Sequence, residues 1–249
     1  MNVNVLIPLI ATIAYIPLFV ILLSNRPWQR RHMFFLLFLI PAVLWSFSTF
    51  LSMSDLLIHN KPLEVKIVLC IAILMLVQFH YFVCSFYQFK RIRIPVAYIF
   101  LVATIVLAAL GHIPYNVEVT ASGINVNYGP WLIAIGLLFL STVGIKDVYS
   151  LLQKYRLSPN PAERNQIIYL LVAIGVLTVF LLSSYTPRGG EFPVSHIGNL
   201  IIACVLTYAI VTHRLLDIRV VFRQALIYVV LYGGSVGIVL LLFNLAHRF

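Results

Sequence analysis

Four polar side chains stand inside long apolar stretches of the sequence and are candidates for contacts with a ligand: Ser46, Gln78, His80 and Asn199. A site for a small amphipathic molecule is mostly apolar and carries a few polar groups that fix the ligand's orientation. The alternative is that these side chains hydrogen-bond between helices and only hold them together, as is common in lipid. We predict the four as ligand-binding residues, with packing as the open alternative.

The sequence has no pattern typical of catalysis or of a metal or cofactor site. None of the seven acidic residues lies deep in an apolar stretch, and no nucleophile stands beside a base. His80 is the one histidine well inside such a stretch, so a second haem ligand at matching depth is not evident. We interpret Cys70, Cys84 and Cys204 as small buried hydrophobic residues. We therefore predict no enzyme activity, no metal and no cofactor, and the lack of deep carboxylates argues against an ion-coupled transporter.

The composition places these residues in a membrane protein. The chain has 249 residues, of which 62% are hydrophobic and 10% charged, and its mean hydropathy is +1.02. Soluble domains carry about 25% charged residues, so this much apolar surface must face lipid. The net charge of +10 is spread over short loops between apolar stretches. That distribution does not form the basic face of a nucleic-acid-binding module, and we expect no nucleic-acid partner.

Eight stretches are long and apolar enough to cross a bilayer as helices, which takes about 20 residues. We predict an all-α fold, a polytopic transmembrane helix bundle of about eight spans. Residues 1–213 would form a seven-helix bundle, and residues 214–249 a cytoplasmic connector and an eighth helix. The stretches are Val5 to Leu23, Met33 to Met53, Lys66 to Tyr87, Pro95 to His112, Trp131 to Leu152, Asn165 to Tyr185, Ser195 to His213 and Gln224 to Leu245.

The distribution of positive charge predicts the orientation. Most of the 17 Lys and Arg residues fall in the first, third, fifth and seventh loops, which are therefore predicted to be cytoplasmic. The N-terminus would then lie outside. Among the outer loops, residues 117–129 alternate apolar and polar side chains around Ser122 and Gly123, a pattern that predicts a β-hairpin covering the outer helix ends.

Three segments carry a resemblance to a known family. Residues 163–171 read ERNQIIYLL, residues 208–231 read YAIVTHRLLDIRVVFRQALIYVVL, and Tyr128-Gly129-Pro130 precedes the fifth stretch. Together they resemble the seven-transmembrane N-terminal sensor region of bacterial membrane histidine kinases. The resemblance extends through the seventh stretch, and residues 213–223 are its most specific part.

The resemblance implies a function that spacing alone does not. Members of this family have an outer N-terminus, a sensory bundle of seven helices and a cytoplasmic kinase-type output module. The resemblance thus implies a multi-pass protein of the bacterial inner membrane, in contact with the lipid bilayer, that perceives a small ligand. The sequence contains no phosphoacceptor segment or ATP-binding domain. We therefore expect the output domain or partner subunit to lie outside this chain, and a homodimer is compatible with the family.

Charged residues near the cytoplasmic helix ends are the predicted route of the signal. A ligand with different affinities for two bundle arrangements shifts their populations, and the segment after the seventh helix would transmit that shift. The predicted coupling residues are Arg164, Arg214, Asp217 and Arg219. The alternative is that they only set topology and reach toward lipid headgroups.

Two other functions stay open at this point. The chain could be a non-catalytic anchor or structural subunit of a larger membrane complex, which needs no ligand. It could also be a transporter of a neutral or lipid-like substrate, which needs no carboxylate relay.

Overall fold

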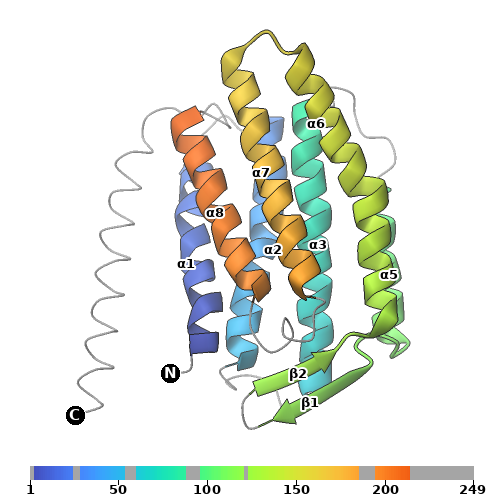
Figure 1. The fold of residues 1–249 in the computed structure, drawn as a ribbon. Helices are drawn as coiled ribbons and strands as arrows, with labels where there is room; N and C mark the ends of the chain where they lie inside the picture. The colour runs from blue at the N-terminus through green and yellow to red at the C-terminus, as the bar shows by residue number, and fades with distance from the viewer. Residues whose placement is uncertain are drawn as a thin grey trace, which may run out of the picture.

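The computed structural model describes residues 3–24, 29–53, 60–87, 96–120, 123–184 and 194–213, and within them it is a helix bundle with one small β-hairpin (Figure 1). In chain order the elements are α1 (Val3–Ser24), α2 (Arg30–Met53), α3 (Lys61–Tyr87), α4 (Tyr98–Ala109), β1 (Asn116–Thr120), β2 (Gly123–Asn127), α5 (Gly129–Phe139), the π-helical turn η1 (Leu140–Gly144), α6 (Ile145–Leu157), α7 (Pro161–Ser184) and α8 (Val194–His213).

The predicted all-α class is confirmed, and each of the first seven predicted stretches contains a helix. Four helical segments are long and apolar enough to cross a membrane: Arg30–Ser52, Lys61–Tyr87, Gly129–Leu157 and Pro161–Ser183. Shorter apolar helices occupy Leu6–Val20, Tyr98–Ala109 and Ser195–Ile210. The eighth predicted stretch, and with it the whole segment 214–249, lies outside the described residues. The number of spans and the orientation stay predictions.

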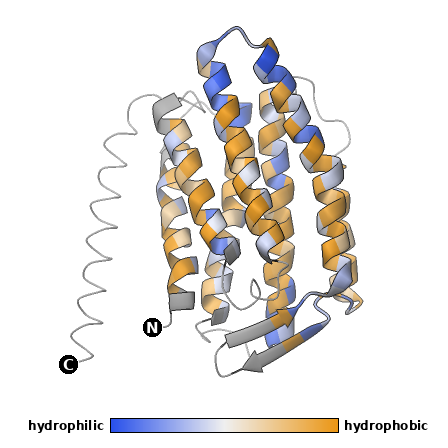
Figure 2. Ribbon diagram, in the orientation of Figure 1, coloured by the Kyte–Doolittle hydropathy of each residue, from blue (hydrophilic) through white to orange (hydrophobic). Residues whose placement is uncertain are grey.

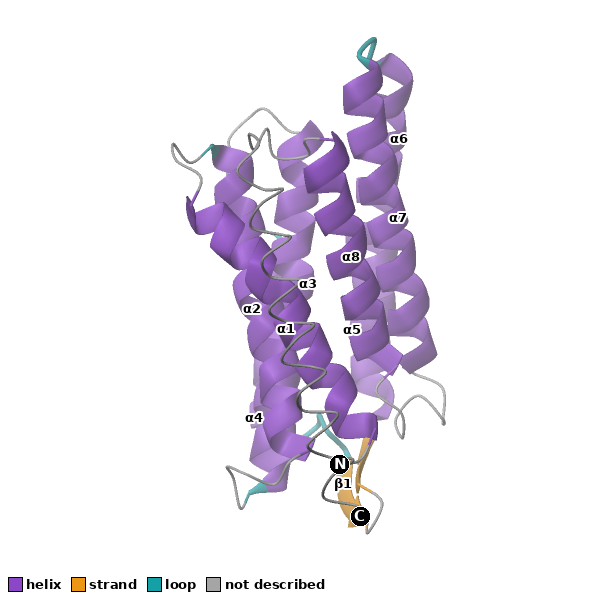
Figure 3. Ribbon diagram, turned by 90° about the vertical axis from the view of Figure 1, so that its left-hand side faces the viewer, coloured by secondary structure: helices purple, strands orange, loops and turns teal. Residues whose placement is uncertain are grey.

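Six of the described helices form a ring in which each contacts the next (Figures 1 and 3). Helix α1 contacts α2 and α8, α2 contacts α3, α3 contacts α6, and α7 contacts both α6 and α8. Helix α4 lies outside this ring and packs against α3 and α5. The α6–α7 connection projects beyond the ends of the other described helices (Figures 1 and 3).

The two faces of α1 show how a mostly apolar helix is divided between the interior and the exterior of the bundle. Its buried side chains include Ala11, Tyr15, Leu18 and Leu22, which follow one helical face. Its opposite face exposes large apolar side chains, among them Ile10, Ile13 and Val20. Hydrophobic residues predominate along the helices of the bundle generally (Figure 2). A helix exposed in this way is stable in lipid, where an apolar face carries no cost.

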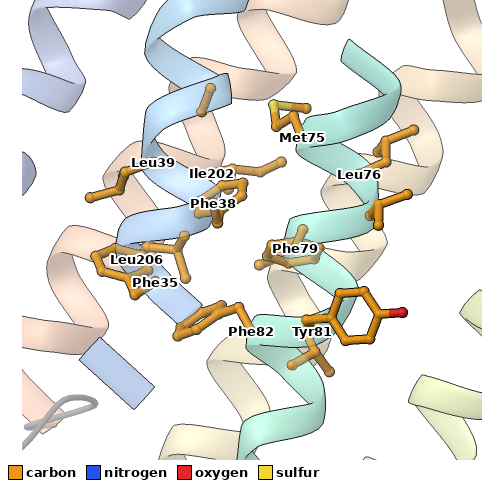
Figure 4. Packing of buried hydrophobic residues seen from close by; sticks show 14 of the residues in the cluster. Phe35, Phe38, Leu39, Met75, Leu76, Phe79, Tyr81, Phe82, Ile202 and Leu206 are labelled. Atoms are coloured by element: carbon orange, nitrogen blue, oxygen red, sulfur yellow. The ribbon is translucent and has the colours of Figure 1, made fainter. Parts of the chain in front are cut away.

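The densest packing joins α2 to α3 through stacked and tilted aromatic rings (Figure 4). The ring centroids of Phe35 and Phe82 lie 5.0 Å apart, and those of Phe38 and Phe79 lie 5.2 Å apart. Such aromatic pairs contribute about 0.5–1.5 kcal/mol each beyond their buried area. This packing fixes the position of α3, which carries several of the polar residues considered below.

Helix α4 is shorter than the predicted stretch Pro95 to His112. It ends in a Schellman motif, in which the His112 amide donates to the Leu107 carbonyl at 2.9 Å and Gly111 adopts a φ of 80°. Residues with a side chain rarely adopt this positive backbone φ, so the glycine at position 111 allows the helix to end here.

The predicted β-hairpin is confirmed. Strands β1 and β2 pair antiparallel, with Asn116 opposite Asn127 and Thr120 opposite Gly123. The hairpin lies at the end of the bundle where α5 begins (Figure 1). This is the end that the charge distribution assigns to the outside.

Candidate functional site

The first candidate site contains a buried hydrogen-bond network that joins α1, α2 and α8. The Tyr15 hydroxyl of α1 donates to Asn199 Oδ1 at 2.6 Å and to the Asn199 carbonyl at 2.9 Å. The Asn199 amide nitrogen in turn donates to the Ser46 hydroxyl of α2 at 2.9 Å. All three side chains are buried. Buried polar groups in lipid need such partners, so this network holds α8 against α1 and α2.

An apolar cavity of about 140 Å³ lies beside this network. It belongs to the half of the bundle nearer the β-hairpin, because its lining includes Tyr128 at the start of α5 and Ser195 at the start of α8. Asn199 contributes a polar group to the wall. The apolar wall comes from α2, α3, α5, α7 and α8, and includes Trp45, Leu69, Ala72, Ile73, Leu132, Leu177, Phe180 and Ile202.

One buried nitrogen close to this cavity has no partner among the described residues. The ring of His196 stacks on Trp45 with centroids 4.4 Å apart, and its Nδ1 is buried without a hydrogen bond in the part of the chain that the structure describes. An unpaired buried polar atom costs about 1–3 kcal/mol. The half of the bundle nearer the β-hairpin therefore combines an apolar cavity with a buried polar nitrogen that a ligand or water could satisfy.

A second polar cluster lies toward the other end of the bundle, between α3 and α6. His80 Nδ1 donates to Asp147 Oδ2 at 2.7 Å, and the Tyr87 hydroxyl donates to Asp147 Oδ1 at 2.6 Å. Cys84 Sγ lies 3.0 Å from the Tyr87 hydroxyl and 3.5 Å from His80 Nε2. His80, Cys84 and Tyr87 share one face of α3, because residues four and seven positions apart align along a helix. These four residues are called the α3–α6 cluster below.

The π-helical turn η1 brings Asp147 into this cluster. Buried residues on α5 include Leu132 and Phe139, and an uninterrupted α-helix with 3.6 residues per turn would continue their face through Lys146. The wider turn takes up one extra residue, so the buried face continues instead through Val143, Asp147 and Leu151. The hydroxyls of Ser141 and Thr142 donate to the Leu138 carbonyl at 3.1 and 2.5 Å within this turn. Such turns occur frequently at functional sites.

The junction next to the α3–α6 cluster is charged. Lys154 Nζ donates to the Phe86 carbonyl in the last turn of α3 at 2.6 Å and lies 2.8 Å from Glu163 Oε1 on α7. Ser158 donates to Glu163 Oε2 at 2.5 Å. Lys154 therefore joins α3, α6 and α7, and its position beside the last carbonyls of α3 suits the negative end of the helix dipole.

The structure separates the predicted ligand-binding residues into three places. Ser46 and Asn199 bond to each other, and only Asn199 also lines the cavity. Gln78 donates to the Tyr98 hydroxyl of α4. His80 belongs to the α3–α6 cluster. Ser46, Asn199 and Gln78 thus make the interhelical hydrogen bonds that the packing alternative describes, and the four do not form a single pocket.

The predicted coupling residues are described only in part. Arg164 lies in the first turn of α7, where its Nε donates to the Tyr155 carbonyl at 3.2 Å and its guanidinium lies 5.2 Å from the centre of the Tyr155 ring. These contacts join α6 to α7, and these two helices with their connecting residues 158–160 are called the projecting hairpin below. Arg214, Asp217 and Arg219 lie outside the described residues.

Sequence reasoning missed Asp147 and the partners of His80. No acidic residue is expected deep in an apolar stretch, and Asp147 stands near the end of the predicted stretch Trp131 to Leu152; the structure adds that its side chain is buried within the apolar helical segment Gly129–Leu157. Cys84 was interpreted as a small hydrophobic residue, and it is buried, but it lies beside His80 and Tyr87. The spacing of His80, Cys84 and Tyr87 on one helical face was the available signal.

Comparison with known proteins adds no relative: no protein-family model, no curated protein and no solved structure matches the chain.

Proposed function

We propose that this chain is a membrane-embedded sensory bundle that binds a small, mostly apolar ligand and passes a conformational signal to an output module outside this chain. The proposed setting is the bacterial inner membrane, with the N-terminus outside. The observation that supports it best is the cavity of about 140 Å³, whose wall is shared by five helices. An apolar cavity of roughly 150 Å³ in another protein binds benzene, so a ligand about the size of one aromatic ring fits.

Helix α7 gives this proposal its signal path. Leu177, Phe180 and Leu181 line the cavity near one end of α7, and the other end forms the projecting hairpin with α6. The hairpin tip is hydrophilic (Figure 2), in keeping with an aqueous location on the predicted cytoplasmic side. A ligand that fits the cavity in only one arrangement of α7 and α8 would shift the population of that arrangement, and the hairpin would move with α7.

A binding measurement on the purified chain in lipid nanodiscs tests the first half of the proposal. The probe is 4-fluorophenol, observed by ¹⁹F NMR, because it combines one aromatic ring with one polar group. We expect a saturable bound signal in the wild type. Leu177→Trp fills the cavity and should abolish this signal. Val179→Trp, on the same helix with a side chain that is 62% exposed, should retain it.

A distance measurement tests the second half. Spin labels on p-azidophenylalanine at Gln153 of α6 and Met33 of α2, both exposed, report the position of the hairpin. We expect 4-fluorophenol to change their distance distribution in the wild type and in Val179→Trp, but not in Leu177→Trp. Binding without a distance change would contradict signalling. The absence of binding would favour an anchor subunit, and a saturable flux across vesicles would favour a transporter.

A further inference from the structure

The α3–α6 cluster contains three side chains of the kinds that bind transition metals. One ligand atom from each of His80, Cys84 and Asp147 can be chosen so that all three lie within 4.8 Å of one another. Cys84 is 2% exposed, and the side chains of His80 and Asp147 are 12% and 6% exposed. We propose that these three residues bind a zinc ion that joins α3 to α6.

The mixture of donor atoms favours zinc over the hard divalent cations. A thiolate, an imidazole nitrogen and a carboxylate oxygen are the ligands that Zn²⁺ takes in proteins. Mg²⁺ and Ca²⁺ bind oxygen ligands almost exclusively, and this cluster offers a single carboxylate. Three protein ligands leave one position of a tetrahedral zinc site for water or another group.

The distances between the donor atoms are close to those of a tetrahedral site. With Zn–N and Zn–O bonds of about 2.0–2.1 Å and Zn–S of about 2.3 Å, a nitrogen and a sulfur ligand lie roughly 3.6 Å apart. Cys84 Sγ lies 3.7 Å from His80 Nδ1 and 3.5 Å from its Nε2. Asp147 Oδ2 lies 2.7 Å from His80 Nδ1, against about 3.3 Å for two zinc ligands. The ion would replace the proton between these two atoms and the proton of the Cys84 thiol, both of which would pass to water, and the His80–Asp147 pair would open by about 0.6 Å.

The charge of the ligands and the hydrogen bond that orients Asp147 are also consistent with a zinc site. One thiolate and one carboxylate together neutralise Zn²⁺, so the loaded site would carry no net charge into a low-dielectric surrounding. The Tyr87 hydroxyl donates to Asp147 Oδ1 and leaves Oδ2 directed at His80. Metal-binding carboxylates are commonly oriented by such hydrogen bonds, whose removal weakens metal binding about 10–100-fold. The turn η1 supplies the rotation that places Asp147 opposite α3.

Zinc at this position would have a structural consequence. Helix α6 contacts α3 in the cluster and continues into the projecting hairpin. A bound ion would fix the base of that hairpin to α3, whereas loss of the ion would leave only hydrogen bonds there. This site is at the other end of the bundle from the cavity, and the zinc proposal does not depend on the proposed ligand.

The first test measures zinc stoichiometry. The purified full chain is equilibrated with Zn²⁺, freed of excess metal and analysed by plasma mass spectrometry. We expect about one zinc per chain, and less than a tenth of that in Cys84→Ser and in Asp147→Asn. Cys70→Ser, on the same helix, and Cys204→Ser should bind zinc as the wild type does. No zinc in the wild type, or unchanged zinc in Cys84→Ser, would overturn the proposal.

A second measurement uses only the wild-type chain and so does not depend on the folding of a variant. Co²⁺ in place of zinc should give the near-ultraviolet charge-transfer band of a cobalt–thiolate bond. Zn²⁺ should slow the alkylation of Cys84 at least tenfold and leave Cys70 and Cys204 unchanged as internal controls. If no thiolate band forms and the alkylation of Cys84 is indifferent to zinc, the site is hydrogen-bonded only and the proposal is wrong.

Discussion

The ring of Phe180 on α7 lies directly against Gly198 on α8, at the wall of the cavity that both residues line. A Cβ atom placed on Gly198 would be 2.5 Å from both Cβ and Cγ of Phe180. Glycine therefore permits this close approach of the two helices, as small residues do between membrane helices.

We expect Gly198→Ala to destabilise the bundle. The added methyl group forces α7 and α8 apart, and such overpacking costs about 1–3 kcal/mol. Thermal unfolding of the purified chain in micelles should show a lower Tm. Gly175→Ala on α7 is the matched control, since nothing lies within 4 Å of its added Cβ. Equal Tm values for the two variants would contradict the close approach.

The hydrogen bond between Asn199 and Ser46 should appear as an energetic coupling. In a double-mutant cycle of Asn199→Ala and Ser46→Ala, we expect a coupling near the average for membrane helices, about 0.6 kcal/mol and at most roughly 1.7. The control cycle pairs Asn199→Ala with Thr207→Ala, because the Thr207 hydroxyl bonds to the Ala203 carbonyl of its own helix. Additive effects in both cycles would show that the interhelical bond adds nothing to stability.

Deleting Thr142 should leave Asp147 directed at α3. With one residue fewer, the turn η1 can return to α-helical hydrogen bonding, and Asp147 then takes the position that Lys146 would have in an uninterrupted helix. Asp147→Asn should therefore lower the free energy of unfolding in the deletion background as much as in the wild type. Thr142→Ala keeps the length of the turn and should also leave the effect of Asp147→Asn intact. Loss of the effect in the deletion background alone would contradict this role of the turn.

Lys154→Met should loosen the junction of α3 with the projecting hairpin. It removes the bond to the Phe86 carbonyl and the ion pair with Glu163, which are partly exposed, so we expect a loss of about 1–2 kcal/mol. Amide exchange in the last turn of α3 should become faster. Arg156→Met removes an exposed charge from the same part of α6 and should not change this exchange. Similar amide exchange in both variants would contradict the role of Lys154 in holding the end of α3.

The helices and the hairpin could be predicted from local signals, whereas Asp147 could not. Runs of about 20 apolar residues and the alternation around Ser122 and Gly123 each depend on neighbouring residues. The partnership of His80 with Asp147 depends on a contact between residues 67 positions apart, and on one extra residue in the turn η1. A helical wheel drawn without the extra residue of η1 places Lys146, and not Asp147, on the face toward α3.

The pairing of the polar residues was unpredictable for a related reason. Ser46, Gln78, His80 and Asn199 were chosen because each interrupts an apolar stretch, which shows that a residue needs a partner but not which partner. Tyr15 and Tyr98 supply two of those partners, and both are amphipathic residues that the sequence gives no reason to single out.

Because α7 reaches from the cavity to the tip of the projecting hairpin, a small rotation at the cavity moves the tip much farther. From Leu177 at the cavity to Asn160 at the tip, the helix and its first linking residue span roughly 25 Å at about 1.5 Å per residue. A tilt of only about 5° about the cavity would carry the tip roughly 2 Å sideways. If α7 tilts as we propose, a displacement too small to unpack the aromatic contacts of the bundle would be amplified at the tip, where the proposed output partner would detect it.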